Sequence, residues 1–234
     1  YDANNINPLY GFFVARAGLG ASESMRSKLA EYNDPRLSRA FITKQGTSGK
    51  EQAPGTADNA VYAPNGTPEQ GTSKYGTSLF MYSISAPTLL LSYHELKFLE
   101  AEALCRLERD AKSALKDAVV AGLLNAENSF TISRKELGKT LINAASSITE
   151  AEAESYFDNT IEAKYTAEPL KTTMTQKYFA LWGASGEATE SYNDVRRMKG
   201  LGENFIELKN PNSFPLRCPY GNSDTTTNAE VKAA

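Results

Sequence analysis

The sequence predicts a mostly α-helical fold that contains one long irregular loop. Two observations lead to this prediction: apolar residues recur at three- and four-residue steps over much of residues 88–200, and residues 43–78 are rich in glycine and proline. Hydrophobic residues make up 41% and charged residues 23% of the 234, as in ordinary globular proteins. This length suits one large domain or two small ones.

A first helix is expected after Ser22, whose hydroxyl can cap it, with Met25 and Leu29 on one face. Asn33-Asp34-Pro35 should end this helix, because the residue before a proline is pushed out of the α region. The segment that follows, 43–78, holds six glycines and three prolines and is predicted to be a loop with at most a short hairpin. Connections of this length are uncommon in compact domains and are often functional.

An amphipathic helix is predicted over Ser92–Leu107. Its apolar positions are Leu96, Leu99, Ala103 and Leu107, and its other faces carry Glu95, Lys97, Glu102 and Arg106. Asp110 is expected to cap a second, antiparallel helix with small apolar residues on one side, namely Ala111, Ala114, Leu115 and Ala118. The pair resembles one tetratricopeptide-type unit, and a single unit cannot bury its own face.

Further helix starts are predicted at two capping boxes, Ser133-x-x-Glu136 and Thr149-x-x-Glu152. Pro169 suits the first turn of another helix, which Gly183 and Gly186 should close. Ser185 is expected to cap the last helix, which stops at Gly200. Residues 201–234 form a tail that is predicted to be irregular.

Residues typical of catalytic or metal sites are scarce. The only histidine, His94, is expected to be satisfied or to face solvent, and no second His or Cys lies at a metal-ligand spacing. Cys105 and Cys218 form no C-x-x-C pair, and the sequence does not tell whether they pair with each other. Gly18-x-Gly20 lacks the third glycine of a dinucleotide-binding loop. We therefore expect no enzyme activity, no metal and no other cofactor.

Charge and hydropathy give no sign of a nucleic-acid partner or of a membrane-spanning helix. There are 25 basic and 28 acidic residues, with a net charge of −3, so net charge gives no reason to expect a nucleic-acid or anionic-membrane partner. No apolar run approaches the ~20 residues that span a bilayer. Arg196 and Arg197 are expected to form salt bridges that hold the last helices, and Arg196→Ala is predicted to destabilise the fold more than it changes binding.

Candidate ligand-binding residues lie in or beside the long loop. Tyrosine presents a flat apolar ring to a sugar and keeps its hydroxyl in water. Tyr62, Tyr75 and Tyr82 are the aromatic candidates, and Asn65 is a candidate hydrogen-bonding partner. Anchoring of the loop is the alternative role for these tyrosines, while Tyr178 and Trp182 are expected to pack in the core.

Three segments together resemble the C-terminal half of the SusD/RagB family. The first is Met25–Leu29 followed by Tyr32-Asn33-Asp34-Pro35-Arg36-Leu37, similar to the helix and N-D-P-R-L of that family. The second is Pro87–Arg106, close to its S-Y-x-E-x-x-F-L-x-A-E-A helix. The third is Thr175–Leu181 with Glu190–Arg197, similar to Q-K-W-x-A-L and E-A-W-x-D-x-R-R.

The resemblance implies a SusD-like α-α superhelix of tetratricopeptide-like helix pairs with long irregular loops. Residues 1–234 would then be the C-terminal portion of one domain: a loop at 43–78, a helical core at 88–200 and a tail at 201–234. The family binds oligosaccharide, or sometimes peptide, at the bacterial cell surface and passes it to a SusC-like TonB-dependent transporter. The implied partners are this transporter, a glycan and a missing N-terminal half, and the implied location is the outer membrane of Bacteroidetes, with the lipid anchor in the absent part.

Two other functions stay open at the level of sequence. A tetratricopeptide-type scaffold would bind protein or peptide along a concave helical groove instead of a loop. A glycoside hydrolase would need two carboxylates at ~5–10 Å, and the 28 acidic residues leave that open, although most lie at helix starts or on polar faces.

Overall fold

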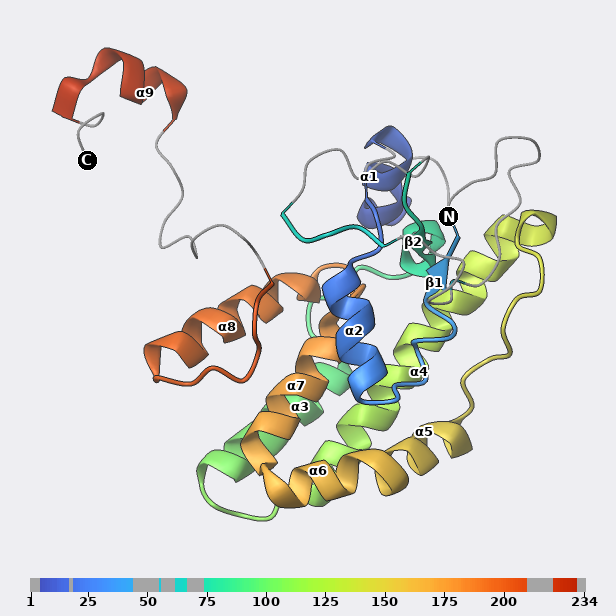
Figure 1. The fold of residues 1–234 in the computed structure, drawn as a ribbon, viewed down its shortest axis with the longest axis vertical. Helices are drawn as coiled ribbons and strands as arrows, with labels where there is room; N and C mark the ends of the chain where they lie inside the picture. Colours follow the sequence, from blue (N-terminus) through green and yellow to red (C-terminus); the bar gives the residue numbers. More distant parts are fainter. Residues whose placement is uncertain are drawn as a thin grey trace.

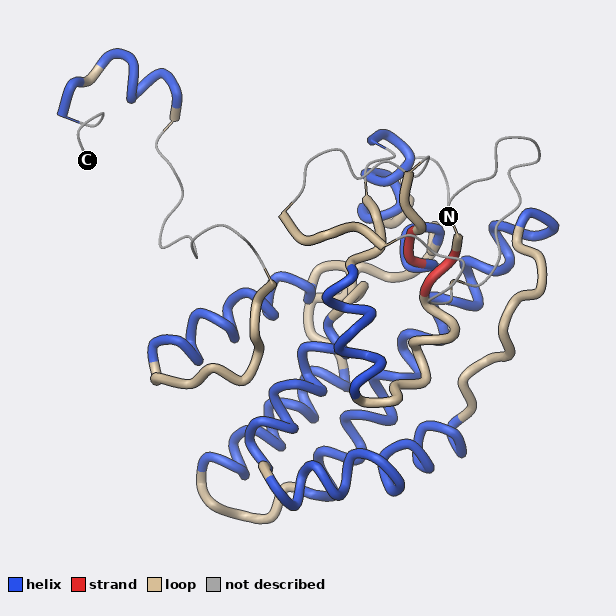
Figure 2. Tube along the Cα trace, in the orientation of Figure 1, coloured by secondary structure: helices blue, strands red, loops and turns tan. Residues whose placement is uncertain are grey.

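The computed structural model describes residues 5–16, 19–43, 55, 62–66, 74–209 and 221–230. The predicted mostly helical fold is confirmed, as Figure 1 shows, and the short strands form a small patch in Figure 2. The N-terminal elements are α1 (Pro8–Arg16), α2 (Glu23–Glu31), β1 (Phe41–Ile42), β2 (Thr77–Ser78) and the 3-10 turn η1 (Leu79–Tyr82).

The helical body begins with a long antiparallel pair, α3 (Tyr93–Arg106) and α4 (Lys112–Leu137). A 3-10 turn η2 (Gly138–Thr140) ends α4, and a second helical run consists of α5 (Glu150–Tyr156), the π-helical turn η3 (Phe157–Ile161) and α6 (Glu162–Ala167). The remaining elements are α7 (Pro169–Leu181), η4 (Glu187–Thr189), α8 (Glu190–Gly200) and α9 (Asn222–Thr227). Because α7 packs against both α3 and α4, these three helices form the centre of the body.

The main core lies where these helices meet α2 and η1. Its fully buried aromatic side chains are Phe41, Phe80, Phe98, Phe130, Phe157 and Phe179. The small residues predicted on the inner side of α4 are all buried there. Close packing of α4 against α7 follows from Gly122, where an added Cβ would lie 2.9 Å from the Ala180 side chain.

Several predicted helix starts are confirmed. The Ser22 hydroxyl accepts a hydrogen bond from the Met25 amide at 3.3 Å, and the Thr149 hydroxyl accepts one from the Glu152 amide at 3.2 Å. Pro169 occupies the first turn of α7. These signals are local, so the sequence carries them without any tertiary information.

Other predicted starts are wrong. Ser133 lies inside α4, where its hydroxyl donates to the Leu79 and Ser129 carbonyl oxygens, so it joins α4 to η1 and begins no helix. Asp110 accepts from the Lys112 amide, but α4 begins at Lys112 and Ala111 is its cap residue. The helix predicted after Ser185 begins later, at Glu190, because η4 comes first.

The predicted orientation of α3 is also wrong. The structure buries Glu95, Phe98, Ala101 and Glu102 and leaves the predicted apolar face exposed. Burial of Glu102 is stabilised by Arg106 Nε at 2.7 Å and by Arg197 Nη2 at 2.8 Å. Because Arg197 is 95 positions away in the chain, the periodicity of α3 alone could not reveal this partner.

The ends of the Gly/Pro-rich segment are held together by β1 and β2. These strands pair antiparallel, with Phe41 opposite Ser78 and Ile42 opposite Thr77. Most of the segment between them lies outside the described residues, so the extent of the predicted loop stays a prediction. In the tail, α9 is a helix where the sequence predicted irregular structure. No helix in the described ranges is long and apolar enough to cross a membrane.

Candidate functional site

Three segments meet at the start of α2 and build the framework of the candidate site. The Ala21 amide donates to the Gly76 carbonyl at 2.8 Å, and the Ala63 amide donates to the Ala21 carbonyl at 2.7 Å. Ser22 and Ala63 form a parallel bridge, and the Thr77 hydroxyl donates to the Leu19 carbonyl. Backbone hydrogen bonds therefore fix residues 62–66 and 76–78 on the chain that leads into α2.

An apolar hollow of about 510 Å³ lies on one side of this framework. Its wall is formed by α1, the chain before α2, the β2–η1 region and the turn after α7. The lining residues include Leu9, Phe12, Leu19, Ser22, Thr77, Ser78, Met81, Trp182 and Ser185. This volume suits a small ligand, and an apolar wall with a few hydroxyl groups is typical of sites that bind one.

Trp182 is one of two aromatic residues that line the apolar hollow. It follows the last residue of α7, and its ring packs against Phe41 and Phe80 with centroid distances of 5.3 and 5.1 Å. Gly183 comes next with φ of +79°, and a Cβ there would lie 2.3 Å from the Phe80 ring. Only glycine fits this turn, so the Trp182 ring is held by packing on a fixed backbone.

A polar hollow of about 590 Å³ lies beside α2. Its lining residues are Glu23, Ser24, Ser27, Lys28, Glu31, Pro64, Asn65, Glu207 and Lys209. The Ser22 hydroxyl, which lines the apolar hollow, donates to the Asn65 side-chain oxygen at 3.0 Å. The two hollows therefore adjoin at Ser22. Burial lowers the pKa of Lys28 despite the nearby Glu207 and Glu31 carboxylates.

The four residues predicted from the sequence occupy different surroundings. Asn65 lines the polar hollow, as described. Tyr62 is half-buried, with its ring 5.3 Å from the Phe41 ring and the Arg26 guanidinium 5.4 Å from its centroid, and burial raises its pKa. Tyr75 is only 7% exposed, and the Tyr82 ring packs edge-on against Phe13 at 5.2 Å. None of the three tyrosines is among the residues that line these two hollows.

Sequence reasoning assigned Trp182 to the core and did not single out Phe12. Trp182 does pack in the core, but it also lines the apolar hollow. Phe12 lines the same hollow and is 53% exposed. The sequence carried one signal for Trp182: an aromatic residue that directly precedes a glycine at a helix end lies where the chain turns and its side chain can reach the surface.

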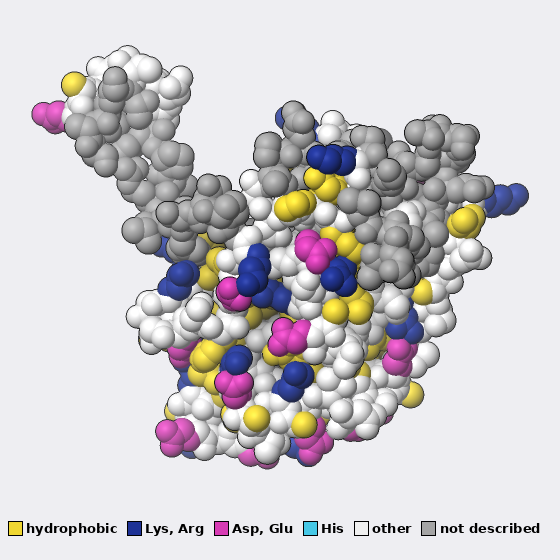
Figure 3. All heavy atoms as spheres, viewed as in Figure 1, with side chains coloured by type: hydrophobic (Ala, Val, Ile, Leu, Met, Phe, Trp, Pro, Cys, Tyr) yellow, Lys and Arg dark blue, Asp and Glu magenta, His cyan; other side chains and the backbone are white. Residues whose placement is uncertain are grey.

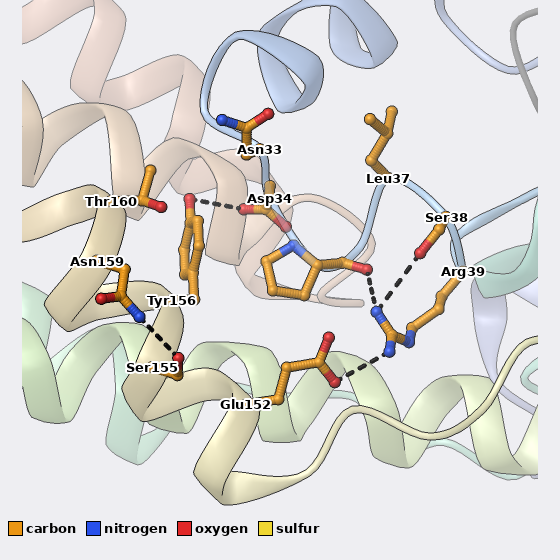
Figure 4. A pocket seen from close by; sticks show the side chains of 11 residues that line it. Asn33, Asp34, Leu37, Ser38, Arg39, Glu152, Ser155, Tyr156, Asn159 and Thr160 are labelled. Atoms are coloured by element: carbon orange, nitrogen blue, oxygen red, sulfur yellow. Dashed lines mark hydrogen bonds and ion pairs between the residues drawn. The ribbon is translucent and has the colours of Figure 1, made fainter.

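A second polar hollow, of about 480 Å³, lies between the turn after α2 and the α5–η3 run (Figure 4). Its polar groups are mostly used within the protein. Arg39 donates to the Ser146 and Pro35 carbonyls and to Glu152, and the Tyr156 hydroxyl donates to Asp34. Since no exposed aromatic ring lines it, this hollow has less surface for stacking against a sugar than the two adjoining hollows at Ser22.

The described residues hold no group of three or more His, Cys, Asp or Glu side chains that could bind a metal. His94 does not face solvent: it is buried, and its Nε2 lies 3.5 Å from Glu187 Oε2 without a hydrogen bond in the described part of the chain. His94 lines neither hollow. The two hollows thus offer aromatic surface, hydroxyls and an amide, which suits binding of a polar ligand.

Comparisons with known proteins show what the chain is similar to. The family described as starch-binding and associating with the outer membrane matches residues 2–220. A crystal structure of a SusD/RagB family protein from Bacteroides thetaiotaomicron VPI-5482 shares 63% sequence identity with this chain, with a TM-score of 0.90. The match covers 100% of this chain and 50% of the chain in that crystal structure. A SusD homolog from Bacteroides fragilis NCTC 9343 shares 19% sequence identity, with a TM-score of 0.63, and the match covers 99% of this chain and 52% of the homolog's chain.

The chain thus spans about half the length of these solved relatives. No curated protein matches it. The family match extends over nearly the whole sequence, and the B. thetaiotaomicron structure superimposes on all of it. The chain therefore belongs to the SusD-like family of starch-binding proteins that associate with the outer membrane.

Proposed function

We propose that this chain binds oligosaccharide at the two adjoining hollows without cleaving it. The observation that carries the proposal is the position of Trp182 on the wall of the apolar hollow, next to the polar hollow that contains Asn65. A sugar ring has an apolar C–H face and a polar rim. An indole ring beside hydroxyl and amide groups complements both.

The proposed role is capture of a glycan nutrient at the bacterial surface and its delivery to a SusC-like TonB-dependent transporter. The family description, which includes starch binding and the outer membrane, supports this role. We further propose that the chain works as the C-terminal half of a longer lipid-anchored protein. Asn65 is the best placed of the residues chosen from the sequence, and Tyr62, Tyr75 and Tyr82 stay as candidates that support or extend the site.

Fluorescence tests the proposal directly, because Trp182 is the single tryptophan of the 234 residues. Titration with a starch-derived malto-oligosaccharide should change the emission of Trp182 in a saturable way. Phe12→Ala should weaken binding by about tenfold or more, since it removes an exposed part of the wall. Calorimetric titration of Trp182→Ala should show a larger loss.

Tyr192→Ala is the matched control, because it removes a partly exposed aromatic ring from α8, away from the lining of both hollows. Its affinity should equal that of the wild type. Melting curves separate loss of binding from loss of folding, which matters for Trp182 because of its core contacts. Binding that is unchanged in both Phe12→Ala and Trp182→Ala would rule out this site.

A further inference from the structure

The apolar hollow is poorly matched to a sugar without substituents. Its large apolar side chains are Leu9, Phe12, Leu19, Met81 and Trp182, and no charged side chain of the described residues lines it. A sugar hydroxyl that enters such a space loses its hydrogen bonds to water. Burial therefore favours the ligand only where a polar group of the protein replaces that water, or where the buried part of the ligand is apolar.

Two of the hydroxyl groups on this wall are already used within the protein. Thr77 donates its proton to the Leu19 carbonyl oxygen at 2.8 Å, and Ser22 donates its proton to an amide oxygen of the polar hollow at 3.0 Å. A hydroxyl has one proton, so neither group can donate a second hydrogen bond to a ligand. Ser78 and Ser185 are the other hydroxyls of the wall. The apolar hollow thus presents few donors to the several hydroxyls of a sugar ring.

The polar hollow has the groups that the apolar hollow lacks. Ser24, Lys28 and Asn65 are among its lining residues, and their side chains can hydrogen-bond to sugar hydroxyls. Because the two hollows adjoin at Ser22, a ligand that spans them meets polar groups at one end and an apolar wall at the other. The ligand that fits both hollows is therefore divided in the same way.

We propose that the ligand is a sugar with a short alkyl or acyl group on one of its oxygens, and that this apolar group occupies the apolar hollow. The sugar ring then lies where the hollows adjoin, beside Trp182, with its hydroxyls toward the polar hollow. Burial of the apolar group adds affinity, because each buried CH₂ strengthens binding about three- to fourfold. This inference rests on the proposed glycan capture and names the class of glycan.

Two glycosides of the same sugar test the inference. Butyl maltoside carries three more CH₂ groups than methyl maltoside, on the same oxygen, and calorimetric titration of this chain measures the affinity for each compound. We expect butyl maltoside to bind about tenfold or more tightly than methyl maltoside. Equal affinities for the two compounds would overturn the inference and leave glycan capture intact.

Leu19→Asn shows whether the gain in affinity arises in the apolar hollow. Leu19 lines this hollow and is not part of the main core, and asparagine has a similar shape with a polar end. The ratio of the two affinities should fall from about tenfold to about twofold or less. Leu201→Asn is the matched control, because Leu201 is 58% exposed and lines neither hollow, and it should keep the wild-type ratio. An undiminished ratio in Leu19→Asn would place the alkyl group elsewhere and overturn the inference.

Titration with hexanol supplies a readout that needs no sugar. Trp182 is the single tryptophan and lines the apolar hollow, so its emission should change in a saturable way as hexanol is added. Leu19→Asn should weaken this response. A saturable response to hexanol without binding of either maltoside would support an apolar occupant of the hollow and overturn the proposed glycan capture. The absence of both responses would overturn both proposals.

Discussion

Asp34 and Arg36 form a buried ion pair in the turn after α2. The Arg36 guanidinium binds the Asp34 carboxylate with both Nε and Nη2, at 2.8 and 2.6 Å. Its Nη1 donates to the Phe179 carbonyl in α7 at 2.7 Å, and the Tyr156 hydroxyl of α5 reaches Asp34. Two residues of a predicted turn thus join three helices.

Replacing Arg36 should therefore destabilise the protein strongly. Arg36→Ala leaves the Asp34 carboxylate buried without its partner, which costs about 3–5 kcal/mol of unfolding free energy. Urea denaturation followed by circular dichroism measures this loss. The matched control is Arg26→Ala, which breaks a partly exposed pair with Glu23 and should cost less than about 1 kcal/mol. Similar losses for the two variants would contradict this reasoning.

At the residue scale, the sequence predicted the candidate site only in part. Asn65 was identified because an amide in a polar loop is a plausible ligand group, and it does line a hollow. Trp182 was missed as a site residue because its helical context favours the core. Packing and ligand contact can involve the same ring, and only the tertiary structure shows that one side of it borders a hollow.

At the scale of elements, the sequence predicted helices better than it predicted their faces. Caps at Ser22 and Thr149 use neighbouring amides, so their signals are complete within four residues. The buried side of α3 depends instead on Arg197, from another helix. A helix with leucines on one side and phenylalanine and alanine on the other offers two possible core faces, and periodicity alone cannot choose between them.

A buried cluster of titratable side chains joins the start of α3 to η4. His94 Nε2 lies 3.5 Å from Glu187 Oε2, and both side chains are almost fully buried. Burial and the adjacent Glu187 carboxylate raise the pKa of Glu95 to about 7, while Lys177 opposes this and Glu190 adds to it. Burial lowers the pKa of His94, and the nearby Glu187 and Arg36 modify this shift in opposite directions. Lys177 is already paired with Asp194 at 2.8 Å, so the carboxyl groups of the cluster outnumber the basic groups that could neutralise them.

This cluster should make stability depend on pH. A raised pKa means that the folded protein holds its proton more tightly, so the stabilisation by protonated Glu95 is complete below pH 4.5 and is lost as the pH rises through about 7. Glu95→Gln keeps the neutral shape. The unfolding free energy of Glu95→Gln, taken relative to that of the wild type, should rise by about 2–3 kcal/mol between pH 4.5 and pH 8. Urea denaturation at each pH measures this difference.

The comparison with Glu95→Gln isolates one group, because His94 is present in both proteins. His94 acts in the opposite direction, since its lowered pKa removes stability as the pH falls below its ordinary range. Glu100→Gln, an exposed change on the same helix, is the control substitution for these measurements. A stability difference between Glu95→Gln and the wild type that stays constant with pH would disprove the linkage.

At the scale of the whole molecule, the resemblance to a known family predicted more about the protein than its composition did. Composition and periodicity predicted a mostly helical globular chain. The order of the motifs around Asn33–Leu37, Ser92–Ala103 and Thr175–Arg197 identified the family, which the match over residues 2–220 shows. The loop segments could not be derived in this way, because loop conformation depends on contacts between segments that are distant in sequence.

The distribution of charge leads to a last prediction. Figure 3 shows Lys and Arg side chains interspersed with Asp and Glu over one face, and the net charge is only −3. A neutral oligosaccharide bound through stacking and hydrogen bonds releases no counter-ions. Its affinity should change less than about twofold between about 50 mM and about 500 mM salt, measured by titration of Trp182 fluorescence. A nucleic acid or other polyanion would lose orders of magnitude over the same range. A steep salt dependence would therefore point to a charged ligand and away from the neutral glycan proposed for the hollows at Ser22.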